Sequence, residues 1–260
     1  MRGAHSTSTL LSAAIESRRA LVLGGSSEAR LLATRIAADP RLQGVISLAG
    51  RTSAPLAHDL PTRTGGFGGV EGLTRYLIDE RISHVVDATH PFAARISANA
   101  RAACAAAGVP LLALTRPPWV MAPGDRWIEV ADNANAACAL GDSPRRVFLA
   151  IGRQGVADFR CAPQHDYVLR VIEPPSADDL PPCCEVIFGR GPFALNDEIA
   201  LMRDRGIETL VTKNSGGALA YAKIEAARAL GLKVVMIARP ASGDVVVTHD
   251  IDAAMAFLAS

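Results

Sequence analysis

Six short apolar segments of this chain each end in a turn of small residues that carries a charged or hydroxyl group. These stretches are residues 21–28, 48–53, 85–90, 150–153, 187–191 and 210–215. Helical patterns of about ten to fifteen residues run between them, and this alternation is typical of βαβ units with a parallel sheet. Ligands of such sheets bind beyond the carboxyl ends of the strands. The pattern therefore predicts an α/β fold with a site for one or two large anionic ligands.

The overall charge and the cysteines exclude several classes of partner. The chain has 27 basic and 26 acidic residues, a net charge of +1, so we expect neither a nucleic-acid-binding nor a membrane-surface protein. No apolar run reaches the roughly 18 residues that a membrane span needs. The five cysteines form no C-x-x-C pair and no metal-ligand spacing with histidine, so we expect no metal and a reducing, cytoplasmic location. The sequence leaves the oligomeric state open.

The length of 260 residues allows two small α/β domains. We expect two doubly wound, Rossmann-like parallel-sheet domains that face a central cleft. Residues 1–17 are predicted as a flexible N-terminal extension, 18–142 as a nucleotide-binding domain and 143–260 as a second α/β domain. The boundary rests on the short, polar, proline-containing segment 141–144. One larger sheet is the alternative.

The turn after the first strand has the composition of a phosphate-binding loop. Gly24 and Gly25 let the backbone pass close to a pyrophosphate, and the following helix starts near Ser26, Ser27 and Glu28, with an N-terminus that favours negative charge. The spacing G-G-x-x-x-A departs from the G-x-G-x-x-G fingerprint. We predict that these five residues bind the cofactor; a tight turn without a ligand is the alternative.

The end of the second strand distinguishes the two nicotinamide dinucleotides. NAD-binding sites usually place an acidic residue there for the ribose 2′-hydroxyl, whereas this chain has Gly50, Arg51, Thr52 and Ser53. A guanidinium pairs with a phosphate through two charge-assisted hydrogen bonds. These four residues therefore favour NADP(H) over NAD(H), unless Arg51 is an ordinary solvated loop residue.

A glycine-rich loop follows a little further along the chain. It contains Gly66, Phe67 and Gly68 and stands just before a predicted helix. Such a loop can close over a cofactor or line the crevice between domains, and we assign these three residues to the cofactor site. A flexible connector is the alternative.

The third predicted strand ends in Asp87, Ala88 and Thr89, which we place at the cofactor, and His90 follows them. Pro91 suits the first position of the next helix, with Thr89 or His90 near its cap. A histidine held in a crevice can donate a proton at neutral pH, so His90 is a catalytic candidate. A buried capping histidine is the alternative.

Basic residues follow the predicted strands of the second half at equivalent positions. Arg153, Arg190 and Lys213 lie at or just beyond strand ends, and Arg239 follows another strand. Such residues would line one edge of one sheet and suit a flat ligand rimmed with carboxylates or phosphates. Helix starts beside them add backbone N–H groups that favour an anion. The predicted substrate-binding residues are Arg153, Arg190, Lys213, Asn214, Ser215 and Gly216.

In their order and spacing, these motifs resemble the precorrin-6A reductase family, the NADPH-dependent reductases of cobalamin (corrin ring) biosynthesis. The resemblance extends from about Ala20 to Pro240 and does not include the residues before Arg18. It rests on LGGSSEAR (23–30), AGR (49–51), GGFGG (65–69), DATHPFA (87–93), IGR (151–153), GRGPF (189–193) and TKNSGG (212–217).

The resemblance implies an oxidoreductase acting on a CH–CH bond, which uses NADPH to reduce one double bond in the macrocycle of precorrin-6A and gives precorrin-6B. It also implies that the substrate, a tetrapyrrole fringed with carboxylates, occupies the cleft between two Rossmann-like domains. A sister group acts on the cobalt-containing substrate, and the motifs do not separate the two. The stereochemistry of hydride delivery is not readable from the sequence.

Saturating the bond also needs a proton on the neighbouring carbon, and the candidate donors are His90, Lys213, Tyr221 and water. A short-chain dehydrogenase is disfavoured because Tyr221 is followed by Lys223 and not by a lysine at the Tyr-x-x-x-Lys spacing. A non-catalytic NADP-binding sensor would not need the basic second half. Another NADP-dependent reductase of a polyanionic substrate is a further alternative.

Overall fold

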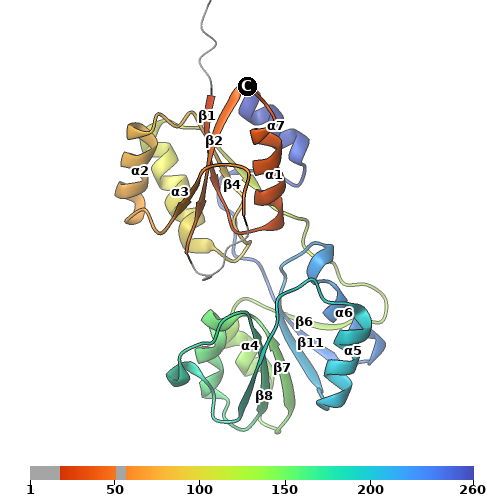
Figure 1. Cartoon of the computed structure of the whole chain (residues 1–260). Helices are drawn as coiled ribbons and strands as arrows, with labels where there is room; N and C mark the ends of the chain where they lie inside the picture. Colours follow the sequence, from red (N-terminus) through yellow and green to blue (C-terminus); the bar gives the residue numbers. More distant parts are fainter. Residues whose placement is uncertain (1–17, 51–56) are drawn as a thin grey trace, which may run out of the picture.

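The structure is a computed structural model that describes residues 18–50 and 57–260. Within these residues the strands form two six-stranded sheets, one in each lobe of the molecule (Figure 1), and every strand pair is parallel. The prediction of two parallel-sheet α/β units is confirmed, and the alternative of one larger sheet is wrong.

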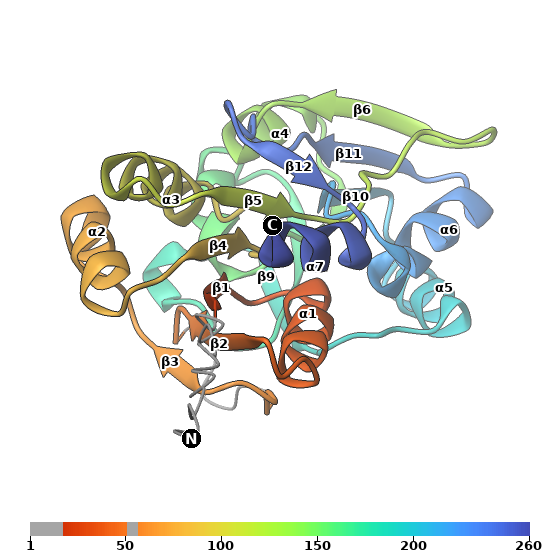
Figure 2. The same cartoon turned by 90° about the horizontal axis from the view of Figure 1, so that it is seen from above.

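The first sheet has the strand order β12-β5-β4-β1-β2-β3. Its strands are β1 (Arg18–Leu23), β2 (Leu42–Leu48), β3 (Thr62–Thr64), β4 (His84–Asp87), β5 (Leu111–Leu114) and β12 (Val246–Thr248). Helices α1 (Ser27–Ala37) and α7 (Ile251–Ala259) cover one face, and α2 (Gly69–Asp79) and α3 (Ala94–Ala107) cover the other (Figure 2). Helix α1 buries Leu32, Ala33 and Ile36 against the sheet, at the three- and four-residue spacing of one helix face.

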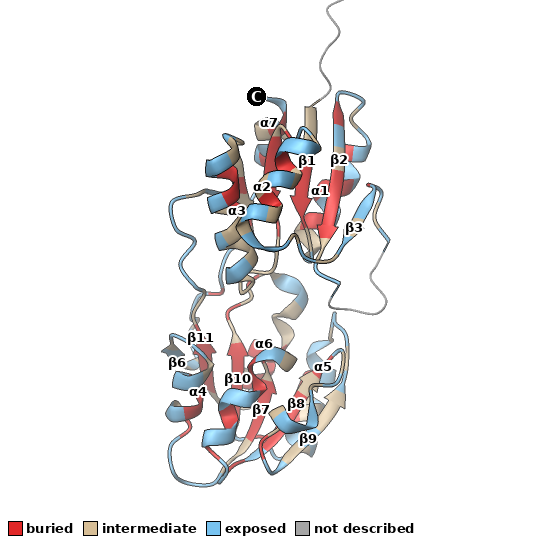
Figure 3. Cartoon of the chain, turned by 90° about the vertical axis from the view of Figure 1, so that its left-hand side faces the viewer, coloured by how far each residue is buried: buried red, intermediate tan, exposed pale blue. Residues whose placement is uncertain are grey.

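The second sheet has the order β6-β11-β10-β7-β8-β9. Its strands are β6 (Arg126–Val130), β7 (Arg146–Ala150), β8 (Asp166–Val171), β9 (Cys184–Phe188), β10 (Thr209–Lys213) and β11 (Lys233–Ile237). One face packs against α4 (Asn133–Ala139) and the 3₁₀ helices η1 (Arg153–Cys161) and η2 (Ala177–Asp179). The other face packs against α5 (Leu195–Asp204), η3 (Ala218–Ala220) and α6 (Ala222–Ala229). The central strands of both sheets are buried (Figure 3).

The two sheets exchange edge elements, so they divide the chain differently from the predicted boundary after residue 142. Strand β6 pairs with β11 of the second sheet, although it precedes that boundary, and β12 returns to pair with β5 of the first sheet. Helix α4 buries Ala136 and Ala137 in the second core, and α7 buries Ala254 and Leu258 in the first. The alternation of elements along the chain does not reveal which sheet receives an edge strand, because either sheet could accept it.

Two connectors result from this exchange. The first connector (residues 115–125) leads from β5 to β6, and the second connector (residues 238–245) leads from β11 to β12. Both pass between the lobes (Figure 1). Within the described residues, no helix is both long and apolar enough to cross a membrane.

The start of α3 differs from the expectation that Pro91 occupies its first position. The helix begins at Ala94, and the amide of Ala93 instead closes a turn by donating to the carbonyl of His90 at 2.7 Å. This turn lets Phe92 pack against the hydrophobic core of the second sheet. The tertiary contact therefore takes precedence over the local preference of proline for a helix start.

Candidate active site

The glycine turn after β1 forms a cradle at the point where the strand order of the first sheet reverses. Gly25 has φ +126°, a conformation that L-residues rarely adopt, and a Cβ built on it would meet no atom within 4 Å. Ser26 caps α1 by accepting a hydrogen bond from Ala29 N at 3.1 Å. The same hydroxyl donates to the carbonyl of Ala88 at 2.7 Å. Two predicted cofactor segments, residues 24–28 and 87–89, are thus brought together beside the open space at Gly25.

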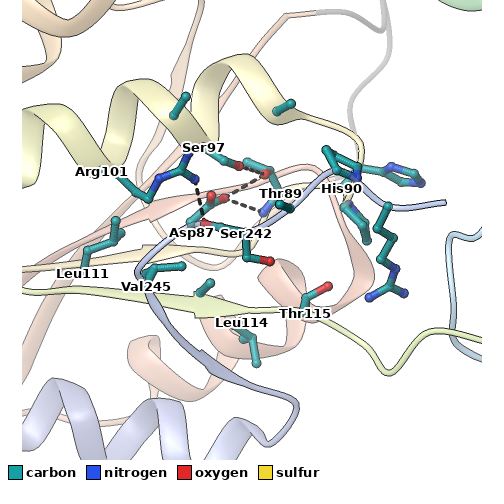
Figure 4. Close-up of a pocket in the computed structure, with 17 residues that line it drawn as sticks. Asp87, Thr89, His90, Ser97, Arg101, Leu111, Leu114, Thr115, Ser242 and Val245 are labelled. Atoms are coloured by element: carbon teal, nitrogen blue, oxygen red, sulfur yellow. Dashed lines mark hydrogen bonds between the residues drawn. The ribbon is translucent and has the colours of Figure 1, made fainter. Parts of the chain in front are cut away.

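The residues after β4 line a cavity of about 230 Å³ (Figure 4). Thr89 donates its amide and its hydroxyl to Asp87 Oδ1, at 3.1 and 2.7 Å, and its hydroxyl lies 3.5 Å from that of Ser97. Arg101 of α3 reaches across to the carbonyl of Ser242 on the second connector at 2.9 Å. The cavity therefore lies between the carboxyl ends of β4 and β5, helix α3 and the second connector.

His90 also lines this cavity, and it lies among positive charges. Burial, together with the positive charges of Arg116, Lys213, Arg239 and Lys223, lowers the pKa of its imidazole from 6.5 to about 3. Its Nδ1 accepts a hydrogen bond from Phe92 N at 3.3 Å, so the neutral ring carries its hydrogen on Nε2. With this pKa the ring is neutral at neutral pH, so the only ring proton that His90 could donate there is the one on Nε2.

The glycine loop before α2 is braced by a residue that the sequence interpretation missed. Arg63 of β3 donates to the carbonyls of Gly65 and Gly66, at 2.6 and 2.7 Å, and its guanidinium lies 3.9 Å from the ring centroid of Phe67. Phe67 in turn packs edge-on against Tyr76 at 5.1 Å between centroids. The loop thus has a defined conformation close to the carboxyl ends of β2 and β3. Of the predicted 2′-phosphate site, Gly50 is described, whereas Arg51, Thr52 and Ser53 lie outside the described residues.

Lys213 lies at the corresponding point of the second sheet, where β7 and β10 adjoin and the strand order reverses. Its Nζ donates to the carbonyl of Ile151 at 2.8 Å and lies 5.5 Å from the ring centroid of Phe92, which belongs to the first half of the chain. Arg153 follows β7 and pairs with Glu173 at 3.2 Å. Lys213 and His90, predicted from different halves of the chain, are therefore brought within electrostatic reach of each other.

The other predicted substrate residues differ in their surroundings. Arg190 is exposed in the loop after β9. Asn214 is buried and bonds twice to the backbone of Trp119 on the first connector, accepting from its amide at 2.8 Å and donating to its carbonyl at 3.0 Å. The carbonyl of Ser215 accepts from Arg116 Nε at 2.7 Å and from Arg239 Nη2 at 3.0 Å.

Gly216 allows the connectors to approach this loop. It has φ +68°, and a Cβ on it would lie 2.1 Å from the carbonyl oxygen of Pro117. In this structure the polar groups of Asn214 and Ser215 therefore anchor the connectors. A contact of residues 214–216 with substrate remains a prediction.

Tyr221 is anchored at a different place from Lys213. Its hydroxyl accepts a hydrogen bond from Arg228 Nη2 at 2.7 Å, and Arg228 also pairs with Asp125 at the end of the first connector, at 2.9 Å. The ring of Tyr221 packs 5.8 Å from that of Trp119. Among the three catalytic candidates, His90 and Lys213 are brought together and Tyr221 belongs to the anchoring of the first connector.

Three charged residues near the second sheet were not singled out from the sequence. Arg170 of β8 and Glu198 of α5 form an ion pair with side chains 10% and 1% exposed. Lys223 is buried, donates to the carbonyl of Ala220 at 2.7 Å and lies 4.7 Å from the ring centroid of Trp119. Burial lowers the pKa of Lys223 to about 7. Each stands inside a strand or helix and not in a turn after a strand, so it is not part of a strand-end motif.

The strand orders, with a switch point at the centre of each sheet, define an α/β protein of the doubly wound, Rossmann-like class. Within the described residues no group of three or more His, Cys, Asp or Glu side chains is arranged to hold a metal ion. The chain belongs to the family described as Precorrin-6x reductase CbiJ/CobK, which matches residues 19–259.

Three relatives illustrate this membership. The chain is 52% identical over 242 residues to a "Precorrin-6A reductase" from Sinorhizobium sp, covering 93% of each chain. It is similar to a solved structure named "CobK precorrin-6A reductase", with a TM-score of 0.87, 51% identity and coverage of 93% of this chain and 96% of that one. A "Cobalt-precorrin-6A reductase" from Salmonella typhimurium is 29% identical over 232 residues, which are 85% of this chain and 87% of the relative.

Proposed function

We propose that this protein reduces one double bond in the macrocycle of precorrin-6A, with NADPH as the hydride donor, as a step of cobalamin biosynthesis. The observation that carries the proposal is the pair of facing switch points: a glycine cradle after β1 and the basic group of Lys213 at the end of β10. The names of the two relatives that are about half identical to this chain supply the substrate. The more distant similarity to the cobalt-named relative favours the cobalt-free substrate.

The residues of the first lobe fit a dinucleotide. The open space at Gly25 leaves room for a pyrophosphate, whose charge the N-terminus of α1 favours. The cavity beside Asp87 and Thr89 lies next to this turn and presents hydroxyl and carboxylate groups to a ribose or a carboxamide. When bound, NADPH would supply the hydride. The preference for NADPH over NADH rests on Arg51 and on the placement of Arg63 near the same strand ends.

The second lobe fits a ligand with several carboxylates. Lys213 is the last residue of the central strand β10, Arg153 follows β7, and Arg190 follows β9. These residues lie at the carboxyl ends of the strands of the second sheet, and Phe92 of the first lobe packs against this sheet near Lys213. A macrocycle in this place would offer its carboxylates to these groups and a ring carbon to the cofactor site.

For the proton we favour Lys213 over His90. The pKa of His90 is held at about 3, so at neutral pH only its weakly acidic Nε2–H is present. The ammonium of Lys213 is a stronger acid than a neutral imidazole, and its bond to the Ile151 carbonyl fixes its direction. His90 would then orient substrate or cofactor rather than transfer the proton.

The test is to mix the purified protein with precorrin-6A and NADPH and to follow absorbance at 340 nm. We expect NADPH consumption with formation of precorrin-6B, and slower turnover with NADH. Binding of NADP⁺ without any oxidation of NADPH would instead support a non-catalytic sensor.

A pair of lysine variants tests the proton donor. Lys213→Met should lower kcat by about 100-fold, as the loss of a general acid does. Lys233→Met is the matched control, because Lys233 also donates to a carbonyl, that of Ala139 at 3.0 Å, but stands at the opposite end of the same sheet. Equal turnover in both variants would exclude Lys213 from the chemistry.

A further inference from the structure

Arg116 of the first connector contacts both lobes of the molecule. Its side chain is only 16% exposed, although it lies in a loop. Its Nε donates to the carbonyl of Ser215, two residues after Lys213, at 2.7 Å. Its Nη1 lies 3.3 Å from the hydroxyl of Ser27 and 3.4 Å from Oε2 of Glu28, both in the first turn of α1. One guanidinium thus joins the cofactor turn to the loop that follows β10.

The loop after β10 is held by both connectors at the same carbonyl. Arg239 of the second connector donates to the Ser215 carbonyl at 3.0 Å, to the Asn214 carbonyl at 2.8 Å and to the Arg116 carbonyl at 2.8 Å. The guanidinium of Arg116 also lies within hydrogen-bonding distance of Ser27 and Glu28 in the first turn of α1. One side chain, that of Arg116, therefore connects the cofactor turn directly to the loop that follows Lys213.

Arg116 also changes the charge at the cofactor turn. Glu28 places a carboxylate in the first turn of α1, where it would repel the pyrophosphate of a dinucleotide. The guanidinium of Arg116 offsets that charge and is a strong donor for phosphate oxygens. Its contacts of 3.3 and 3.4 Å to Ser27 and Glu28 are long for charge-assisted bonds, so exchanging them for a phosphate costs little.

We infer that Arg116 is a positioning residue that couples dinucleotide binding to residues 213–217: its terminal nitrogens bind the pyrophosphate while its Nε keeps the Ser215 carbonyl. Occupancy of the first lobe then orders the loop that positions Lys213 in the second. The inference rests on the proposed function, because it requires the turn at Gly25 to bind a dinucleotide.

The first experiment measures the dissociation constant of NADP⁺ by calorimetry. Arg116→Gln should bind NADP⁺ about 10- to 100-fold more weakly, the range expected for a lost charge-assisted hydrogen bond. Arg116→Lys should recover most of the affinity, because it restores the charge. Arg228→Gln is the matched control: it loosens the far end of the same connector, where Arg228 pairs with Asp125, and should leave the affinity for NADP⁺ unchanged.

The second experiment measures amide hydrogen exchange of residues 213–217 with and without NADP⁺. In the wild type and in Arg228→Gln, NADP⁺ should slow this exchange. In Arg116→Lys it should not, even at saturating NADP⁺, because one ammonium cannot hold both the phosphate and the Ser215 carbonyl in the geometry of a guanidinium. Slowed exchange in Arg116→Lys would overturn the coupling.

Three further outcomes would also decide against the inference. If Glu28→Gln added to Arg116→Gln restored the full wild-type affinity, Arg116 would act only by offsetting Glu28. Unchanged NADP⁺ affinity in Arg116→Gln would overturn the inference but not the proposed function. A wild-type protein that does not bind NADP⁺ would overturn the proposed function and the inference with it.

Discussion

Replacing Asn214 by alanine separates its observed structural contacts from its predicted role in substrate binding. The Asn214 amide satisfies both the N–H and the carbonyl of Trp119, at 2.8 and 3.0 Å, in a buried position. Alanine would leave both backbone groups of Trp119 without these partners. An unsatisfied buried polar group costs about 1–3 kcal/mol, so we expect the free energy of unfolding to fall by roughly 2–6 kcal/mol.

The assay is urea unfolding followed by tryptophan fluorescence, since Trp119 itself reports on the broken contact. Asn135→Ala is the matched control: Asn135 is exposed, and its amide bonds only locally to Asp132 at 2.9 Å. That variant should unfold within about 0.5 kcal/mol of the wild type.

The kinetic constants of Asn214→Ala supply the decisive comparison. If Asn214 serves the connector, the folded variant should show a KM for the tetrapyrrole close to that of the wild type. An unfolding free energy equal to that of the wild type, together with a large rise in KM, would refute the structural reasoning and return Asn214 to the substrate site.

Three further predictions concern charge and backbone geometry. Because the pKa of His90 falls from 6.5 to about 3 on folding, the unfolded chain binds more protons than the folded chain between these pH values. The free energy of unfolding should therefore decrease as the pH falls from about 6.5 toward 3. His90→Gln should weaken this dependence, which urea unfolding at a series of pH values would measure. Glu198→Gln leaves the Arg170 guanidinium buried without its carboxylate and should cost about 3–5 kcal/mol in urea unfolding, whereas Glu185→Gln, at an exposed ion pair, should cost less than about 1 kcal/mol. Gly216→Ala places a methyl group against the first connector and should lower the melting temperature and kcat together; a variant as stable and active as the wild type would contradict the close approach.

Much of the fold was predictable because hydrophobic periodicity is a local property of the sequence. The alternation of apolar segments and helical patterns predicted two parallel sheets, and the sheets are present. Short edge strands escaped this reasoning: β3 and β12 have three residues each, too few to show a period. The exchange of β6 and β12 was also unpredictable, because a strand's pattern does not specify which of two similar sheets it will join.

For the candidate site, the positions of the strand-end residues were predictable, whereas their functions stay predictions. Strand-end residues such as Gly25, Ser26 and Lys213 were found from their position after an apolar segment, and parallel pairing gathers them at one edge of each sheet. Arg116 and Lys223 were not found, because nothing around them in the sequence marks them. Their importance comes from contacts between segments about 90 or more residues apart, as in the bond from Arg116 to Ser215.

By itself the sequence determined the class of fold, the strand-end motifs and the family resemblance, since each depends on residues close together in the chain. Only the tertiary structure decided the protonation of His90 and the tasks of Asn214 and Ser215. The pKa of His90 follows from charges that arrive from both halves of the chain. Asn214 and Ser215 anchor the connectors because the exchange of edge strands brings two arginines and a tryptophan against them. Burial and long-range electrostatics exist only after folding, and for that reason they could not be derived from the order of the residues.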